Sequence, residues 1–171
     1  MKVDKVRDQL EEIEIRDVEE LESLLARAYW IETGLEETLE WDAYTMVKED
    51  NRDLIYKLSH DSQGHKGVIE RFADKIDGVS KEALKEAGGR STFKLTQGTQ
   101  DSELFQELLK REKLVIDIYS RIKENTDDPL VDKIWSGDNQ EFFMNLQYLI
   151  DEEKKHIDMI EPKVGSIGRI R

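Results

Sequence analysis

Apolar residues recur at helical spacing over four long stretches of this 171-residue chain, and this periodicity limits the fold more than any other feature. Residues three and four apart lie on one face of a helix, so each stretch predicts an amphipathic helix with one buried side. No stretch joins alternating polarity to hairpin turn residues, so strands have no support. The predicted helices run from about 17 to 50, 52 to 77, 102 to 125 and 138 to 161, and the fold class is all-α.

The link between the second and third predicted helices is the long one. After a short helical stretch, 81–87, it becomes a polar, glycine-containing segment typical of a loop. Four long helices with one such link describe a four-helix bundle with one long crossover connection between helices 2 and 3. We expect the bundle at residues 17–163, an N-terminal helical extension at 1–16 and a C-terminal tail at 164–171.

Several residues predict helix ends. Asp17 with Glu20 has the form of a capping box at the start of the first helix. Gly78 is expected to stop the second helix and Pro162 the fourth. Residues 130–135 are expected to form one or two helical turns.

Charge and cysteine content exclude several classes of function. The net charge of -13, with no basic patch, opposes binding to nucleic acid or to an anionic membrane. The chain has no cysteine, which excludes disulfides, thiolate metal sites and a catalytic thiol on these residues. It shows neither a signal sequence nor an apolar run long enough to span a membrane, so we expect a cytoplasmic protein.

Two of the three histidines occupy similar places in two predicted helix pairs: each lies in the second helix of its pair. Glu153 and His156 are three residues apart in the fourth helix, which is a metal-ligand spacing, although an acid precedes a histidine by three positions roughly a quarter of the time in so acidic a chain. His65 lies in the second helix. In the helices before them, Glu37 precedes Tyr44 and Glu112 precedes Tyr119, each by seven residues, so each pair shares a helix face.

This joint pattern resembles the rubrerythrin-like branch of the ferritin-like superfamily over about residues 17 to 162. Bundles of this kind place a glutamate on each of two helices and a Glu-x-x-His motif on each of the other two, around two iron ions. The resemblance implies a metal site made of Glu37, His65, Glu112, Glu153 and His156. Glu32, Glu36 and Glu40 lie in the same helix as Glu37, and each is an alternative to it as the inward glutamate. Iron is the implied metal, and manganese and zinc are alternatives. Tyr44 and Tyr119 have two interpretations: donors of a hydrogen bond to a ligand carboxylate, or core residues.

The sequence departs from this pattern at position 62. Ser62 stands where a glutamate is expected three residues before His65, and Asp61 is a candidate substitute on a shifted face of the helix. Three states remain open: a dinuclear site with water or Asp61 in place of the glutamate, a single metal on Glu112, Glu153 and His156, or a site that has lost its metal.

The resemblance implies redox chemistry of the peroxidase or ferroxidase type with dioxygen or peroxide. It also implies a homo-oligomer, and an electron donor on a separate protein because the chain lacks the cysteines of a rubredoxin centre. The alternative is a non-catalytic bundle that serves as an oligomerisation or interaction module, with a metal site degraded at Ser62. The sequence does not identify an organic substrate.

Overall fold

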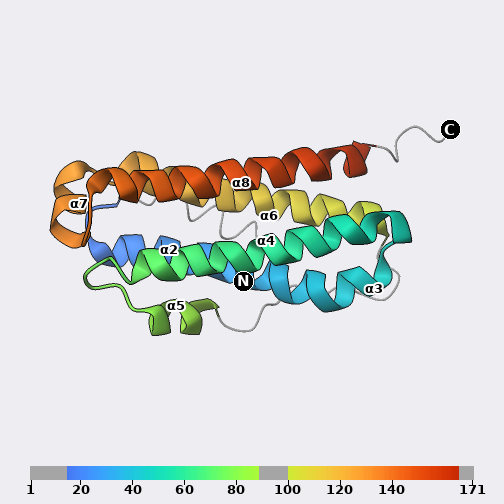
Figure 1. Ribbon diagram of the computed structural model, residues 1–171, viewed down its shortest axis with the longest axis horizontal. Helices are drawn as coiled ribbons and strands as arrows, with labels where there is room; N and C mark the ends of the chain where they lie inside the picture. Colours follow the sequence, from blue (N-terminus) through green and yellow to red (C-terminus); the bar gives the residue numbers. More distant parts are fainter. Residues whose placement is uncertain (1–14, 89–99, 166–171) are drawn as a thin grey trace.

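The computed structural model describes residues 15–88 and 100–165, and every regular element in these ranges is helical (Figure 1). The body consists of four long helices: α2 (Val18–Thr38), α4 (Glu49–Ala73), α6 (Asp101–Asn125) and α8 (Asn139–Gly165). The shorter elements are the π-helical turn η1 (Leu39–Ala43), α3 (Tyr44–Met46), α5 (Lys81–Gly88) and α7 (Asp128–Ile134). The predicted all-helical bundle is confirmed for these residues. The extension predicted at 1–16 and the tail predicted at 164–171 fall largely outside the described ranges.

Contacts at the two ends of the bundle set the helix directions. At one end the Asn51 amide donates to Asp101 Oδ2 at 2.7 Å, so α4 and α6 begin side by side. At the other end the Asp77 amide donates to the Ile134 carbonyl at 2.7 Å, which joins the end of α4 to α7 just before α8. The helices α4 and α6 therefore run in one direction and α2 and α8 in the other (Figure 1). The end of α4 and the start of α6 therefore lie at opposite ends of the bundle.

The helices pack as two antiparallel pairs around one core. The helix α2 packs on α4, α6 packs on α8, and further contacts join α2 to α6 and α4 to α8. Each fully buried Leu, Ile or Phe contributes about 2 kcal/mol. Phe72, Trp135 and Phe142 form an aromatic cluster at one end, with ring centroids 4.8 to 5.4 Å apart. These aromatic contacts join the end of α4 to the start of α8.

Three helix ends differ from the sequence prediction. The helix α4 ends at Ala73, before the stop predicted at Gly78. The first helix does not continue to residue 50, because η1 interrupts its regular hydrogen bonding and extended backbone at Val47 separates it from α4. The fourth helix continues past Pro162 to Gly165. Pro162 is exposed in the last turn, where its missing N–H removes only one helical bond and its ring is free of the core. The prediction that Pro162 closes the helix was therefore wrong.

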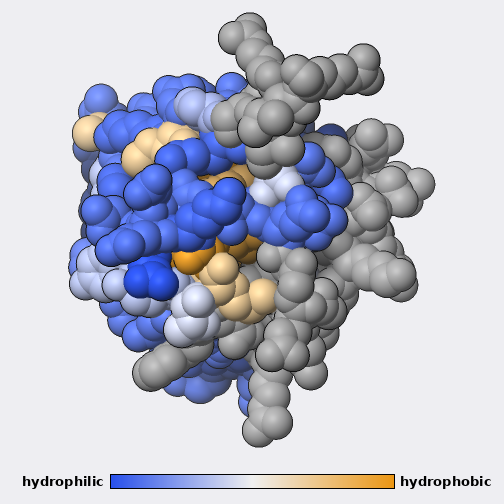
Figure 2. Space-filling view, turned by 90° about the vertical axis from the view of Figure 1, so that its right-hand side faces the viewer, coloured by the Kyte–Doolittle hydropathy of each residue, from blue (hydrophilic) through white to orange (hydrophobic). Residues whose placement is uncertain are grey.

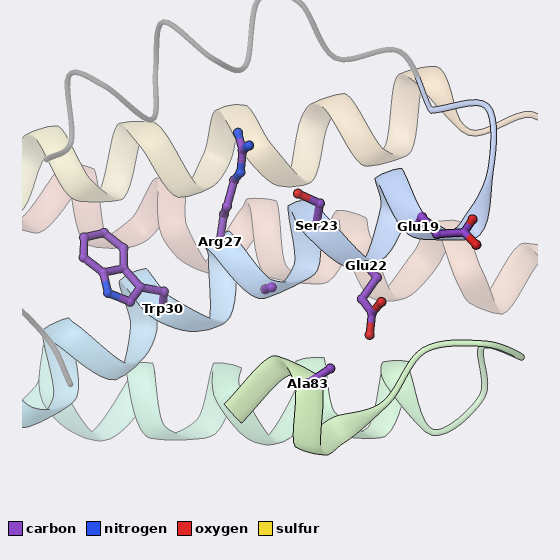
Figure 3. A pocket seen from close by; sticks show the side chains of 7 residues that line it. Glu19, Glu22, Ser23, Arg27, Trp30 and Ala83 are labelled. Atoms are coloured by element: carbon purple, nitrogen blue, oxygen red, sulfur yellow. The ribbon is translucent and has the colours of Figure 1, made fainter. Parts of the chain in front are cut away.

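The surface is mostly polar. Figure 2 shows one end of the molecule, where hydrophilic side chains surround small hydrophobic patches. A groove of about 340 Å³ lies between α2 and α5, where Arg27, Trp30 and Ala83 are among the residues that line it (Figure 3). Within the described ranges, none of the helices combines the length and hydrophobicity needed to cross a membrane.

Candidate metal centre

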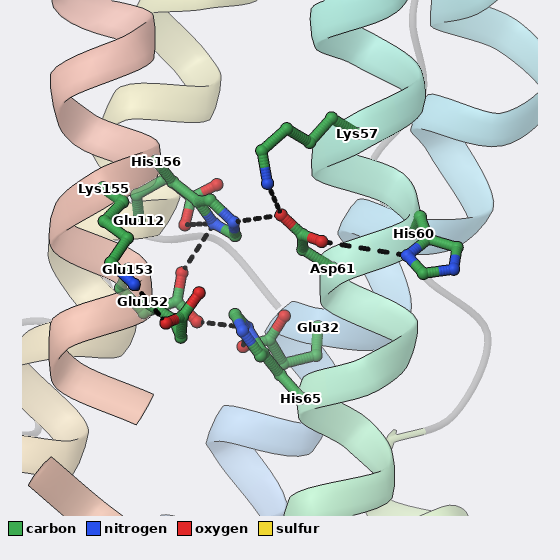
Figure 4. Close-up of polar contacts among 10 residues, drawn as sticks. All are labelled: Glu32, Lys57, His60, Asp61, His65, Glu112, Glu152, Glu153, Lys155 and His156. Carbon is green, nitrogen blue, oxygen red and sulfur yellow. Dashed lines mark hydrogen bonds and ion pairs between the residues drawn. The ribbon is translucent and has the colours of Figure 1, made fainter. Parts of the chain in front are cut away.

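Five buried polar side chains from all four long helices contact one another inside the bundle (Figure 4). None is more than 3% exposed. They are Glu32 of α2, His65 of α4, Glu112 of α6, and Glu153 and His156 of α8. Charged groups are rarely this buried unless they are paired or bind an ion, so the cluster requires a specific explanation.

Alternating steps of three and four residues bring these side chains onto the inner face of each helix. In α2 and the first residue of η1 the buried series is Leu25, Ala28, Glu32, Leu35 and Leu39. In α6 it is Phe105, Leu108, Glu112, Val115 and Tyr119. In α4 and α8 the buried series are Ile55, Leu58, Ser62, His65, Ile69 and Leu146, Leu149, Glu153, His156, Ile160. Each series interrupts its apolar core with polar residues at equivalent positions, so the two helix pairs repeat one pattern.

Glu153 lies between the two histidines. Its Oε1 is 2.6 Å from His65 Nδ1, and its Oε2 is 3.1 Å from His156 Nδ1. The two imidazole rings stack with centroids 5.4 Å apart. Ligand atoms of His65, Glu153 and His156 all fall within 4.8 Å of one another, close enough to share bound ions. One carboxylate therefore serves two imidazoles that belong to different helix pairs.

The other two glutamates lie on either side of this central group. Glu32 Oε1 is 3.5 Å from His65 Nδ1, and Glu112 Oε2 is 3.4 Å from His156 Nδ1. The Tyr119 hydroxyl donates to Glu32 Oε1 at 3.2 Å. Burial, and then the charge of Glu32, raise the pKa of Tyr119 well above its usual value, so the phenol keeps the proton that it donates. Tyr119 thus holds a carboxylate of the opposite helix pair.

Asp61 contacts the outer edge of the cluster. Its Oδ2 is 3.2 Å from His156 Nε2 and 2.5 Å from Lys57 Nζ, and the exposed His60 is 3.8 Å from its other oxygen (Figure 4). Burial raises the pKa of Asp61, but Lys57 and His156 more than offset this and lower it. Because Asp61 contacts the ring nitrogen that faces away from Glu112 and Glu153, it orients His156 and does not take the place of the expected glutamate.

Protons balance part of the buried charge. Burial alone lowers the pKa of each histidine, but contacts with Glu153 and Glu32 raise that of His65 to about 11, and contacts with Glu112 and Glu153 raise that of His156 to about 11. Burial, and then the charge of Glu153, raise the pKa of Glu112 to about 8. In the metal-free protein the imidazoles therefore hold protons in the positions where metal ions would supply positive charge.

Buried atoms without hydrogen-bond partners gather in this cluster. They include Glu32 Oε2, Glu112 Oε1 and Ser62 Oγ. His65 Nδ1 and Glu153 Oε1 are close together but also lack an aligned hydrogen bond. Buried polar atoms are almost always paired, so a group of unpaired ones suggests a missing partner. Carboxylate oxygens with imidazole nitrogens and no sulfur suit iron or manganese. The residues present fit a metal centre.

The structure brings together His65, Glu112, Glu153 and His156, as predicted, but it does not bring Glu37 to them. Glu37 is exposed, and Glu32 occupies the inner position of α2. Five residues turn a helix by about 140°, so Glu32 and Glu37 face different directions. The alternating three- and four-residue series in α2 is visible in the sequence and selects Glu32.

Tyr44 also lies away from the cluster. It is 41% exposed and its ring is 5.8 Å from the Arg52 guanidinium, so the structure gives it no contact with a cluster carboxylate. Glu37 and Tyr44 are both exposed, so their seven-residue spacing brings neither to the cluster. Tyr119 alone of the two tyrosines has the expected hydrogen bond to a cluster glutamate.

Neither a scan against protein-family models nor a search of curated proteins finds a match for this chain.

Proposed function

We propose that this protein is a rubrerythrin-like member of the ferritin-like superfamily that binds two metal ions, with iron as the native metal. The observation that carries the proposal is the position of Glu153, with one oxygen 2.6 Å from His65 Nδ1 and the other 3.1 Å from His156 Nδ1. A carboxylate that contacts two imidazoles in this way would help to hold two metal ions. Glu32 with His65 would hold one ion, and Glu112 with His156 the other.

The fold supports this proposal. In di-metal carboxylate bundles the ligands come from all four helices, and one long crossover joins the two helix pairs. Here α2 and α4 are antiparallel to each other, as are α6 and α8, and the two pairs contribute buried polar side chains at equivalent core positions. Glu32, and not Glu37, is the α2 glutamate at the buried position equivalent to Glu112 of α6.

The protein residues have definable tasks in such a centre. When iron is bound, the centre would supply electrons for the reduction of dioxygen or peroxide. Tyr119 fixes one oxygen of Glu32, and Asp61 holds the ring of His156 so that Nδ1 faces the carboxylates. The buried ligands and their apolar shell favour a small oxidant over a bulky organic substrate. A separate electron-donor protein and a homo-oligomer are further expectations of the resemblance.

An anaerobic ferrous titration tests the proposal. We expect two irons per chain, followed by a change in visible absorbance when oxygen or peroxide is added. His65→Ala should lose iron, whereas His60→Ala, on the exposed face of the same helix, should not. Glu32→Gln should weaken binding, whereas the exposed Glu37→Gln should not. Equal iron binding by both members of each pair would contradict the proposal.

The alternative is a metal-free interaction module in which the imidazoles and carboxylates neutralise one another. The pairing of protonated His65 and His156 with the three glutamates favours it. The unpaired atoms of Glu32, Ser62 and Glu112 count against it. The two functions separate in the same titration, because the module binds no iron and keeps its oligomeric state when Glu153 is replaced by Gln.

A further inference from the structure

We propose that the metal centre takes a small monocarboxylate as an external ligand beside Ser62. This inference rests on the proposed di-metal function and goes further by naming the class of ligand that completes the site. It concerns a feature that is specific to this chain, the serine at the position that is equivalent to Glu153 in the other helix pair.

Ser62 lies in the buried series of α4, between two residues that contact the cluster. It follows Asp61, which contacts His156, and precedes by one helical turn His65, which contacts Glu32 and Glu153. The side chain is 1% exposed, and its Oγ has no hydrogen-bond partner. A buried hydroxyl without a partner is unfavourable, and a ligand oxygen that accepts a hydrogen bond from it would remove that cost.

The size of the missing group indicates the size of the ligand. Glutamate differs from serine by carrying a CH2–COO group where serine carries its hydroxyl. Acetate has almost the same shape as that group. The ligand that Ser62 would need is therefore a small detached carboxylate, supplying the group that α8 supplies through the side chain of Glu153.

The charge of the centre indicates the sign of the ligand. Two divalent ions bring four positive charges, and the carboxylates of Glu32, Glu112 and Glu153 bring three negative ones. Asp61 does not close the balance, because Lys57 lies 2.5 Å from it. One positive charge would remain in a buried site, where an uncompensated charge is expensive. A single monoanion removes it.

Equilibrium dialysis of ferrous ion under argon, in sodium acetate or in sodium chloride of equal ionic strength, tests the inference without any turnover. In the wild-type protein acetate should tighten binding of the second iron by about tenfold, equivalent to about 1.4 kcal/mol. Acetate also complexes free iron weakly, which works against this result and makes a positive one more secure.

Two variants at position 62 refine the test. Ser62→Glu should bind two irons tightly in chloride and show no response to acetate, because it carries its own carboxylate. Ser62→Ala should bind iron as the wild type does in chloride but respond less to acetate, because the hydroxyl donor is gone. Circular dichroism of each variant verifies the helical fold.

The outcomes separate the two proposals. Two irons bound with equal affinity in both salts would overturn the external carboxylate and leave the metal centre intact. No iron bound in either salt would overturn the metal centre and this inference with it. An acetate effect of equal size in Ser62→Glu would also overturn the inference, since the anion would then act elsewhere.

Discussion

The helix pair α6–α8 and the helix pair α2–α4 contribute unequally to the candidate centre. Two positions match: a glutamate in the first helix of each pair and a histidine in the second. Two others differ, since α6–α8 has Tyr119 and Glu153 where α2–α4 has Leu39 and Ser62. The α6–α8 pair therefore carries a full set of polar groups, and the α2–α4 pair carries half of one.

The incomplete pair depends on the complete one. His65 of α4 takes its closest carboxylate contact from Glu153, and Glu32 of α2 takes its hydrogen bond from Tyr119. Glu112 has no equivalent donor, because Leu39 cannot supply one, and its Oε1 stays without a partner. The comparison indicates that polar groups of α6–α8 can position the buried side chains of α2–α4, which has fewer polar groups of its own.

Glu153→Gln should have the largest effect, because it removes the one carboxylate that both histidines share. The amide keeps the size of the side chain but not its charge, so we expect iron per chain to fall from two to near zero. Atomic absorption after gel filtration measures this. Glu152→Gln is the matched control, since Glu152 is half-buried and pairs with Lys155 at 2.5 Å. Two irons retained by Glu153→Gln would show that the two halves do not depend on it.

The pH dependence of the metal-free protein should be the next largest effect. The pKa values of His65 and His156 are raised to about 11 from 6.5, so the folded protein binds more protons than the unfolded chain between these values. The stabilising contribution is complete below about pH 6.5 and decreases as pH rises toward 11. Urea unfolding with a chelator present should show this decrease.

A double variant, His65→Gln with His156→Gln, gives the control for that measurement. Its stability should depend less on pH above 6.5 than that of the wild type, whereas His60→Gln should leave the wild-type slope unchanged. Parallel slopes in all three proteins would contradict the assignment of the protons to the cluster.

Tyr119→Phe should weaken iron binding by about tenfold, because it removes the donor that orients Glu32 and keeps the ring in the core. It should also lower the free energy of unfolding of the metal-free protein by about 1 kcal/mol. Isothermal titration calorimetry and chemical unfolding measure the two effects. Tyr29→Phe is the control, because the Tyr29 hydroxyl bonds Glu70 away from the cluster. Equal losses in both variants would mean that Tyr119 has only a structural role.

Gly64→Ala should have the smallest effect and the opposite sign. An added Cβ at Gly64 meets no atom within 4 Å, so the substitution should stabilise α4 by about 0.5 to 1 kcal/mol through helix propensity. Thermal unfolding measures this, and Gly67→Ala, where the Cβ meets the flexible end of Arg71 at 3.4 Å, offers a comparison. A loss of iron binding in Gly64→Ala would reveal that the α2–α4 half of the site needs a flexible α4.

The apolar periodicity was sufficient to predict the helical bundle and its long link, because each helix buries one regular stripe. His65, Glu112, Glu153 and His156 could be selected because histidine is rare in this chain and its spacing to glutamate is fixed on a helix. Their contacts depend on core positions that the sequence pattern already marks.

The rotation of α2 was harder to predict. Four glutamates crowd this region at positions 32, 36, 37 and 40, and charge does not distinguish the inner one. The tyrosine spacing led to Glu37, but Tyr44 follows η1, whose wider turn shifts the phase of the residues after it. The role of Asp61 also depended on which ring nitrogen of His156 it meets, a detail set by tertiary packing.

Three polar contacts cross from one helix pair to the other at the centre: Tyr119 to Glu32, Glu153 to His65, and His156 to Asp61. Each helix pair is thus an antiparallel hairpin, and the cluster connects the two hairpins near the middle of their length. Bound metal would stabilise that connection. Backbone amides beside His65 and His156 should then exchange their hydrogens more slowly than amides at the ends of the same helices, and chelation should reverse the difference.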